Sequence, residues 1–545
     1  MNDAAPDDVP DSSPVLDPEP DSTAAQVVDI DHRRRRGAAV GLVATLVALG
    51  GAELAAATNR GLRSPVVDVG SRFIDATPAW LKRFAISTFG THDKQALLSG
   101  ILVFLIVYAI VIGIVSTRRR RLGVAGVILF GIIGILAATT ASSASPHWWS
   151  IVPTVVGTLL GSAAMWYLAG VAVRPGAAGD GAVRVAKPDE PTGRRGFLAA
   201  SAGLGIAAVV AGGAGRWLSK RFDVAAARAK IVLPRARKPL AAIPGDVSFD
   251  VAGLTRFVTP NPDFYRIDTA LLVPQVPVDT WKLTITGMVE HRLEFSFDDL
   301  LGRELVESDI TLTCVSNEVG GNLAGNARWL GVPLVQLLQE AGVKRGADQI
   351  VGRSVDGFTA GFPTEAAFDG RGALVAIGMN GEPLPVVHGF PARLIVPGLY
   401  GYVSATKWLT QIELTTFSRF GAYWSQRGWS DHAPIKTLSR IDTPGALARI
   451  PAGRHPIAGV AWAQLRGIDK VEVRVDQGPW QTARLAKELN TTTWRQWMLP
   501  FDFDSGSHTI ECRATDRTGA IQTEARAEPM PDGATGWHSL VVLVS

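Results

Sequence analysis

A single thiol beside a glycine-closed loop is the first feature of the chain that could do chemistry. Cys314 is one of two cysteines in 545 residues and lies in the stretch Thr311-Leu-Thr-Cys-Val-Ser-Asn-Glu-Val-Gly-Gly321. The alternating residues before it and the polar, glycine-rich segment after it predict a strand that runs out into a loop. A rigid strand would aim the thiol, and the loop would let a ligand approach it.

Cationic side chains in a later stretch supply a second kind of chemistry. Residues 379–408 contain His388 and Arg393, and then Ser404 and Lys407 among several glycines. Arginine and lysine beside exposed backbone amides suit a phosphate, whereas a thiolate suits a soft or transition metal. One cysteine without a second soft ligand argues against structural zinc or an iron–sulfur cluster, so the other metal ligands would come from a cofactor.

Together with Asn261-Pro-Asp-Phe-Tyr-Arg-Ile-Asp268, these stretches closely resemble the sulfite oxidase family of molybdopterin enzymes. The run Gly381-Glu-Pro-Leu-Pro…His388-Gly-Phe-Pro-Ala-Arg393…Lys407-Trp408 is long and specific, and the resemblance covers residues 247–545. It implies a molybdenum–molybdopterin cofactor, with Cys314 as the single protein ligand to the metal and two sulfurs from the pterin dithiolene. The residues that it implies for binding the pterin and its phosphate are Tyr265, Arg266, Asp356, His388, Arg393, Ser404 and Lys407.

The substrate side departs from the family pattern. In sulfite-oxidising members the loop after the cysteine carries arginines, but the same positions here are Glu318 and Val319. An acid at that place would repel sulfite. The active-site tyrosine of those members aligns within Tyr423-Trp-Ser-Gln-Arg-Gly-Trp429, so Trp429, Tyr423 and Arg427 are the catalytic candidates beside Cys314.

Apolar runs dominate the chain before this domain, and the mean hydropathy of +0.17 is high for a soluble protein. A bilayer needs about 20 apolar residues per helix. The predicted transmembrane helices are Gly37–Ala57, Ala96–Val115, Leu122–Ala141, Ile151–Val173 and a weaker fifth, Phe197–Gly215.

Basic clusters orient these helices. Arg33–Arg36, Arg118–Arg121 and the pair Arg194-Arg195 border the runs, and the positive-inside rule places them on the cytoplasmic side. Five crossings from an inside N-terminus put everything after residue 216 outside, although the basic loop 58–95 weakens this orientation. We therefore expect a multi-pass cell-membrane protein with an extracytoplasmic catalytic domain.

The fifth run also has the form of an export signal. Thr192-Gly-Arg-Arg-Gly-Phe-Leu198 precedes a stretch rich in Ala and Gly, which looks like a twin-arginine signal. An ordinary arginine pair on the inner flank of a helix is the alternative. Twin-arginine export would carry a domain that has already folded around its cofactor.

The predicted fold is therefore multi-domain. It has an acidic disordered tail over residues 1–36, four transmembrane helices over 37–173 and the fifth over 192–215. A basic tether over 216–246 leads to an α+β catalytic domain over 247–430 and an immunoglobulin-like β-sandwich over 434–545. The sandwich is similar to the family's dimerisation domain, which makes a homodimer a candidate assembly. Cys512 is expected in its core, unpaired with Cys314.

The net charge of only +4 gives no general case for nucleic-acid binding. The sequence predicts a membrane-anchored molybdopterin oxidoreductase that acts on a small anionic or sulfur-containing substrate and has an unidentified electron-transfer partner. Two alternatives stay open. One is a reductase of oxidised sulfur groups such as methionine sulfoxide, and the other is a surface binding or adhesion protein with a degenerate cofactor site.

Overall fold

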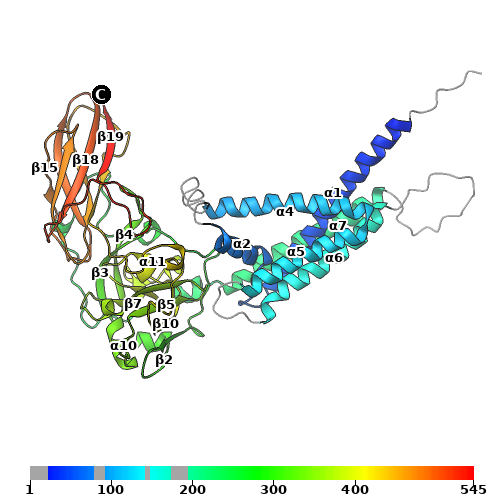
Figure 1. Ribbon diagram of the computed structural model, residues 1–545, viewed down its shortest axis with the longest axis horizontal. Helices are drawn as coiled ribbons and strands as arrows, with labels where there is room; N and C mark the ends of the chain where they lie inside the picture. Colours follow the sequence, from blue (N-terminus) through cyan, green and yellow to red (C-terminus); the bar gives the residue numbers. More distant parts are fainter. Residues whose placement is uncertain (1–21, 79–80, 82–92, 141–147, 174–193) are drawn as a thin grey trace, which may run out of the picture. The chain divides into compact units, whose positions relative to one another are not determined.

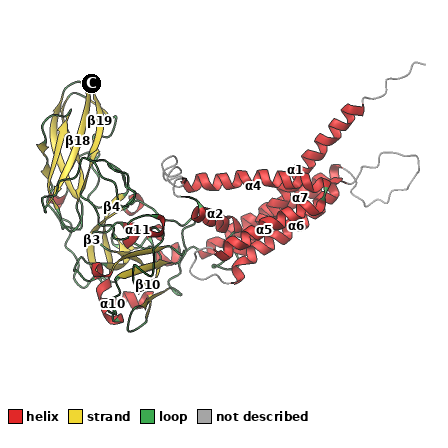
Figure 2. Cartoon of the chain, viewed as in Figure 1, coloured by secondary structure: helices red, strands yellow, loops and turns green. Residues whose placement is uncertain are grey.

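The computed structural model of the protein describes residues 22–78, 81, 93–140, 148–173 and 194–545 (Figure 1). The chain forms two compact units, one that ends at Arg221 and one that runs from Phe222 to Ser545. The described elements of the first unit are helices, whereas strands joined by loops and short helices build the second (Figure 2).

Long helices form the first unit. Those described are α1 (Ser22–Ala56), α2 (Pro65–Ala76), α4 (Asp93–Arg118), α5 (Arg120–Thr140), α6 (Val152–Val173) and α7 (Arg194–Ser219). α1 packs against α4, α6 and α7 (Figure 1). A Cβ on Gly41 would lie 1.8 Å from the Ala109 carbonyl oxygen, and one on Gly113 would lie 2.2 Å from the Gly37 oxygen. Glycines that let backbones approach this closely are typical of helices packed within a bilayer.

Five of the described helices are long and apolar enough to cross a membrane, as the sequence predicts. The spans are His32–Ala56, Gln95–Arg118, Arg120–Thr140, Trp148–Ala172 and Arg195–Ala229. The helix α2 occupies part of the loop that was expected between the first two spans.

Basic residues from separate helices gather at one end of the bundle. Arg33 Nη2 donates to the Thr117 carbonyl oxygen at 2.9 Å, and Arg120 Nη2 donates to the Gly170 oxygen at 3.4 Å. At the opposite end of α1, Arg221 donates to the Ala57 oxygen at 2.8 Å. The basic clusters of the first three spans therefore share one end, and α7 leads the chain out at the other.

The N-terminal segment differs from the prediction of a disordered tail over residues 1–36. The helix α1 begins at Ser22, because every proline of this segment precedes Ser22 and the residues that follow it contain none. Residues 1–21 lie outside the described part of the chain, as does the start of the predicted export signal up to residue 193.

The segment 216–246 is not a free tether. The helix α7 continues to Ser219, and Val224 and Ala236 beyond it are buried. Arg228 Nε donates to the Leu384 oxygen at 2.8 Å, and its Nη2 lies 2.9 Å from a carboxylate oxygen of Glu382. Apolar residues spaced through this basic, proline-rich stretch bury surface against the second unit, which composition alone does not reveal.

The first part of the second unit is an α+β domain with two sheets. Their strand orders are β2-β1-β10-β5-β6 and β3-β4-β7-β8, with β9 against β7. The strands are β1 (Lys282–Gly287), β2 (Leu293–Ser296), β3 (Val306–Thr313), β4 (Ala324–Pro333), β5 (Gln349–Ser354), β6 (Thr359–Pro363), β7 (Leu374–Met379), β8 (Glu382–Pro383), β9 (Arg393–Ile395) and β10 (Leu409–Thr415). The α-helices α9 (Phe297–Leu301), α10 (Leu334–Ala341) and α11 (Gly401–Ser404) lie between them in the sequence. One pair, β1 with β10, is parallel and the other strand pairs are antiparallel.

The second part is a sandwich of two sheets, ordered β11-β13-β17-β16 and β12-β19-β18-β14-β15. The strands are β11 (Leu438–Thr443), β12 (Arg449–Ile450), β13 (Gly453–Trp462), β14 (Ile468–Val475), β15 (Gln481–Thr482), β16 (Arg484–Leu485), β17 (Arg495–Phe503), β18 (Gly506–Asp516) and β19 (His538–Val544). Ile457 and Trp497 from one sheet share a core with Val471, Val542 and the fully buried Cys512 from the other. Its immunoglobulin-like classification stays a prediction.

Candidate functional site

A cavity of about 100 Å³ lies beside the end of β3 in the α+β domain. A single water needs only about 10–15 Å³, so this space suits a ligand rather than a packing defect. The predicted site residues that line it are Cys314, Tyr265, Asp356, His388, Arg393 and Lys407. They come from four separate parts of the sequence, and the fold brings them to one place.

Cys314 follows the last residue of β3, as the sequence predicts. Its N–H donates to the Leu323 carbonyl oxygen at 2.9 Å, which closes the loop between β3 and β4. The residue is 7% exposed, and its Sγ lies 2.9 Å from Ser316 Oγ. Burial raises the pKa of the thiol, while the hydrogen bond to Ser316 and the charge of Lys407 oppose that rise.

Arg393 is a buried cation without a carboxylate partner among the residues that the structure describes. It is 5% exposed, and its guanidinium donates to the carbonyl oxygens of His388, at 3.1 Å, and Ala405, at 3.5 Å. Its Nε has no hydrogen-bond partner. Burial lowers the pKa of Arg393 to about 10. An unsatisfied donor on a buried charge is costly, and an anion bound in the cavity would satisfy it.

Lys407 is the second cation at the cavity. Its Nζ lies 2.9 Å from Asp268 Oδ2, and the same oxygen lies 2.9 Å from Arg266 Nε. Burial lowers the pKa of Lys407 to about 8, although Asp268 opposes the shift. Asp268 is thus shared by two cations, and Arg393 has no carboxylate partner among the described residues, so its guanidinium keeps an unpaired positive charge beside the cavity.

His388 contributes a neutral ring. Its Nε2 lies 3.1 Å from the Asn261 carbonyl oxygen, and because that oxygen can only accept, Nε2 carries the proton. Burial and the charge of Arg393 lower the pKa of His388 to about 4. The ring Nδ1 is therefore left as an acceptor.

Two backbone features hold these loops together. Gly389 has a φ of +110°, and a Cβ there would lie 3.0 Å from the Lys407 Cα, so only glycine fits. Trp408 has a φ of +48°, which costs a non-glycine residue roughly 1–3 kcal/mol. Its Nε1 donates to the Val386 oxygen at 2.8 Å, and this contact secures the strained turn beside Lys407.

Five predicted site residues do not line the cavity. Ser404 Oγ donates to the Tyr400 carbonyl oxygen at 3.0 Å, so its hydroxyl is occupied within its own turn. The Arg266 side chain pairs with Asp268. The Arg427 guanidinium stacks on the Tyr423 ring at 3.6 Å, and Trp429 packs behind the cavity wall against Tyr402.

The sequence prediction did not single out several residues that line the cavity. They are Phe264, Ile267, Asp268, Thr269, Ser354, Phe358, Gly401, Tyr402, Ala405, Trp408 and Trp424. Trp424 lies within Tyr423–Trp429, the segment that the resemblance aligns with an active-site tyrosine. The charge of Asp268 was the one readable signal, because Lys407 needs a counter-ion when buried.

The residues present fit a cofactor that brings its own metal ligands and an anionic group. Among the described residues, no three His, Cys, Asp or Glu side chains cluster to hold a metal ion. Arg393 Nε and the buried Ser354 Oγ, which also has no partner, are free to bond a ligand in the cavity.

Comparisons with known proteins agree with this geometry. The family model "Oxidoreductase molybdopterin binding domain" matches residues 270–424. The mitochondrial sulfite oxidase of Macaca fascicularis is 29% identical over 344 residues, which cover 53% of this chain and 62% of that protein. The "uncharacterized oxidoreductase YuiH" of Bacillus subtilis is 34% identical over 149 residues, which cover 27% of this chain and 72% of that protein.

A crystal structure of the sulfane dehydrogenase SoxCD from Paracoccus pantotrophus also matches, with 25% identity and a TM-score of 0.47 over 53% of this chain and 84% of that one. The chain spans about three fifths of the length of the mitochondrial relative, at 62%.

The family model and the two relatives define a molybdopterin-binding oxidoreductase domain. The chain belongs to the sulfite oxidase family of molybdopterin-dependent oxidoreductases. Membership of this family implies a molybdenum–molybdopterin cofactor.

Proposed function

We propose that the protein is a membrane-anchored oxidoreductase in which Cys314 binds molybdenum. The observation that carries the proposal is the buried Arg393 guanidinium, which no described carboxylate pairs and which shares a cavity with the thiol. A cation buried without a counter-ion is stabilised when an anion binds. The planar guanidinium is suited to a phosphate, which it can bond with two donors.

Each residue of the cavity would have a distinct task toward the cofactor. Arg393 and Lys407 would bind the phosphate, and Tyr265 and Asp356 would contact the pterin. The His388 Nδ1 acceptor would take a hydrogen bond from a pterin N–H, since Nε2 is committed to Asn261. When bound, the cofactor would supply oxygen-atom or two-electron transfer at molybdenum.

The catalytic domain would lie on the outer face of a cell membrane. Basic residues of α1 and α5 meet at one bundle end, where Arg33 and Arg120 bond the ends of neighbouring helices. The positive-inside rule would place that end in the cytoplasm, and α7 would then lead the chain outward. The Arg194-Arg195 pair would serve as a twin-arginine signal for the folded domain. We further propose that the protein forms a homodimer through the sandwich and exchanges electrons with a partner protein.

A reductase of oxidised sulfur groups is the second candidate, and the charge of the cavity favours it. Arg393 and Lys407 are the lining cations, and both would be engaged by the cofactor phosphate. The remaining wall includes the rings of Phe358, Tyr402 and Trp424. A neutral sulfoxide between aromatic rings would meet less desolvation cost there than a sulfite dianion without a cation.

A substrate screen on the molybdenum-loaded full chain tests the proposed activity. Sulfite oxidation and methionine sulfoxide reduction would be measured side by side with artificial electron acceptors and donors. Turnover of either substrate supports an oxidoreductase, and turnover of the sulfoxide alone selects the second candidate. A fully loaded chain that turns over no sulfur compound would favour a surface binding protein and contradict the proposal.

A further inference from the structure

The loop that carries Cys314 ends in two glycines, and these glycines meet the C-terminal sandwich. Within the loop, Asn317 Oδ1 accepts from the Leu323 N–H at 2.7 Å, and the Gly321 N–H donates to the Glu318 oxygen at 2.9 Å. These bonds make the loop one compact turn. Contacts that hold the glycine end of the loop in place therefore also hold Cys314 in place.

Arg440 of strand β11 holds that glycine end. Its Nη1 donates to the Gly321 carbonyl oxygen at 2.8 Å, and its Nη2 donates to Thr255 Oγ1 at 3.0 Å. Its Nε lies 2.6 Å from Asp442 Oδ1. The residue is 7% exposed, so this charged fork is fixed in a largely buried place. A guanidinium can make these three bonds at once because its donors are planar and rigid.

His538 of strand β19 contacts the neighbouring glycine. A Cβ on Gly320 would lie 2.2 Å from His538 Nε2, and Gly320 has a φ of +80°. Any other residue at position 320 would strain the backbone and strike the ring. The ring itself is fixed from behind, because the Ile441 N–H donates to its Nδ1 at 2.9 Å.

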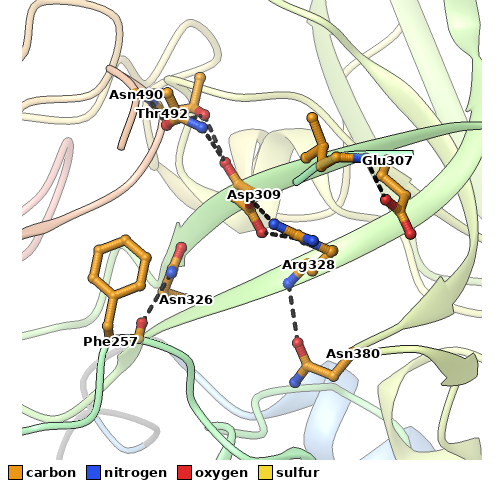
Figure 3. A network of polar contacts seen from close by, with 9 residues as sticks. Phe257, Glu307, Asp309, Asn326, Arg328, Asn380, Asn490 and Thr492 are labelled. Carbon is orange, nitrogen blue, oxygen red and sulfur yellow. Dashed lines mark hydrogen bonds and ion pairs between the residues drawn. The ribbon is translucent and has the colours of Figure 1, made fainter. Parts of the chain in front are cut away.

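The sandwich also holds the strand that leads to Cys314. The loop before β17 supplies Thr492, whose Oγ1 donates to the Asp309 oxygen at 2.7 Å and whose carbonyl accepts from the Thr311 N–H at 3.0 Å. Asn490 Nδ2 donates to the same Asp309 oxygen at 3.2 Å (Figure 3). On the other side Arg328 of β4 pairs with the Asp309 carboxylate at 2.8 Å (Figure 3). Strand β3 is thus fixed between its neighbour β4 and the sandwich.

We propose that Arg440 and His538 are positioning residues for Cys314, and that the sandwich is a structural part of the catalytic site. The strand three residues before the thiol and the loop six residues after it are both bound to the sandwich. A domain that served dimerisation alone would not need to bind the chain on both sides of one cysteine. This inference rests on the proposed role of Cys314, but its test reads the reactivity of the thiol in the cofactor-free chain and so can fail independently of the proposed reaction.

Alkylation of Cys314 in the cofactor-free full chain tests the inference. Iodoacetamide labelling, followed by mass spectrometry, would report Cys314 and Cys512 separately. Cys512 is 0% exposed in the sandwich core and serves as an internal control for unfolding. Arg440→Gln should raise the labelling rate of Cys314 about tenfold and leave Cys512 protected, since one charge-assisted hydrogen bond to the loop is lost. Arg440→Lys should raise it less.

Arg474→Gln is the matched control, because Arg474 is a sandwich arginine that pairs with Glu511 at 2.6 Å and stacks on Trp480. It should leave Cys314 at the wild-type rate. If Arg440→Gln also exposes Cys512, Gly320→Ala decides, since it displaces the loop from His538 and leaves the sandwich sequence unchanged. Faster labelling of Cys314 alone in Gly320→Ala supports the inference. Wild-type labelling of Cys314 in both Arg440→Gln and Gly320→Ala would overturn it, whether or not the loaded enzyme is active.

Discussion

Lys407 and Asp268 form an ion pair at the cavity, with 2.9 Å between Nζ and Oδ2 and side-chain exposures of 11% and 4%. Asp268→Asn would leave the Lys407 ammonium buried without its partner, which costs about 3–5 kcal/mol in a buried pair. We expect a loss of that size in the free energy of unfolding of the cofactor-free chain, measured by urea titration in detergent.

The exposed pair between Lys282 and Glu294 provides the control for this measurement. Glu294→Gln should change the free energy of unfolding by less than about 1 kcal/mol, because solvent screens the pair. Equal losses in the two variants would mean that the burial of the Lys407 pair has no energetic consequence.

Arg393 should recognise phosphate through its fork of donors. Inorganic phosphate at ten times its dissociation constant should stabilise the cofactor-free wild-type chain by about 1.4 kcal/mol. Arg393→Lys should lose most of this effect, since the ammonium lacks the planar fork of donors with which a guanidinium binds a phosphate through two hydrogen bonds. Thermal unfolding with phosphate against chloride at matched ionic strength measures it. Arg353→Lys, which alters an arginine paired with Glu413, should respond like the wild type.

His538 should make the free energy of unfolding fall as the pH is lowered. Burial and the charge of Arg440 lower its pKa to about 4 in the folded chain, from 6.5. The unfolded chain binds the proton more tightly, so stability is full above pH 6.5 and is lost as the pH falls toward 4. The expected loss from this residue between pH 7 and pH 5 is about 1–2 kcal/mol.

His538→Gln tests this linkage, because glutamine keeps an acceptor for the Ile441 N–H and does not titrate. The variant should lose less stability than the wild type between pH 7 and pH 5. His388, whose pKa is also about 4, adds a loss of the same sign in both chains. His508, whose pKa Asp476 raises, acts in the opposite direction in both. Identical pH slopes for the two chains would contradict the role of His538.

The arginine pair at the start of α7 should decide where the catalytic domain resides. Replacing Arg194 and Arg195 by lysines keeps the positive charge of this flank but removes the proposed twin-arginine signal. A reporter fused after Ser545 should then remain inside the cell. A reporter that still appears outside would show that export does not depend on this pair.

The sequence pattern predicts the local elements that carry the reactive residues, but it does not predict which side chains meet in the folded protein. The strand and loop around Cys314, the five apolar spans and the two-sheet C-terminal part follow from local periodicity, which the chain displays directly. The cavity does not, because it joins Phe264, Cys314 and Lys407 across more than 140 residues of sequence. Trp424 lines the cavity and Trp429 does not, because the backbone directs neighbouring aromatic side chains differently; the catalytic role of Trp429 stays a prediction.

Burial and hydrogen bonding at the edges of the domains also could not be predicted from the local sequence. Residues 216–246 have the composition of a tether, and only the apolar surface of the second unit makes Val224 and Ala236 burial sites. Ser404 has the right residue type for a phosphate contact, but its own turn uses the hydroxyl. The hydrogen bond from Arg440 to the Gly321 carbonyl oxygen has no sequence signal, since the two residues lie in different domains.

The most direct measurement of the central claim is the molybdenum and pterin content of the purified full chain and of Cys314→Ser. The wild type should contain about one molybdenum and one pterin per chain. Serine is a hard oxygen ligand in place of a soft thiolate, so the variant should retain the fold and lose molybdenum at least about tenfold, the scale expected when a metal site is disrupted. A wild-type chain that binds neither molybdenum nor pterin, or a Cys314→Ser chain with full molybdenum content, would contradict the account.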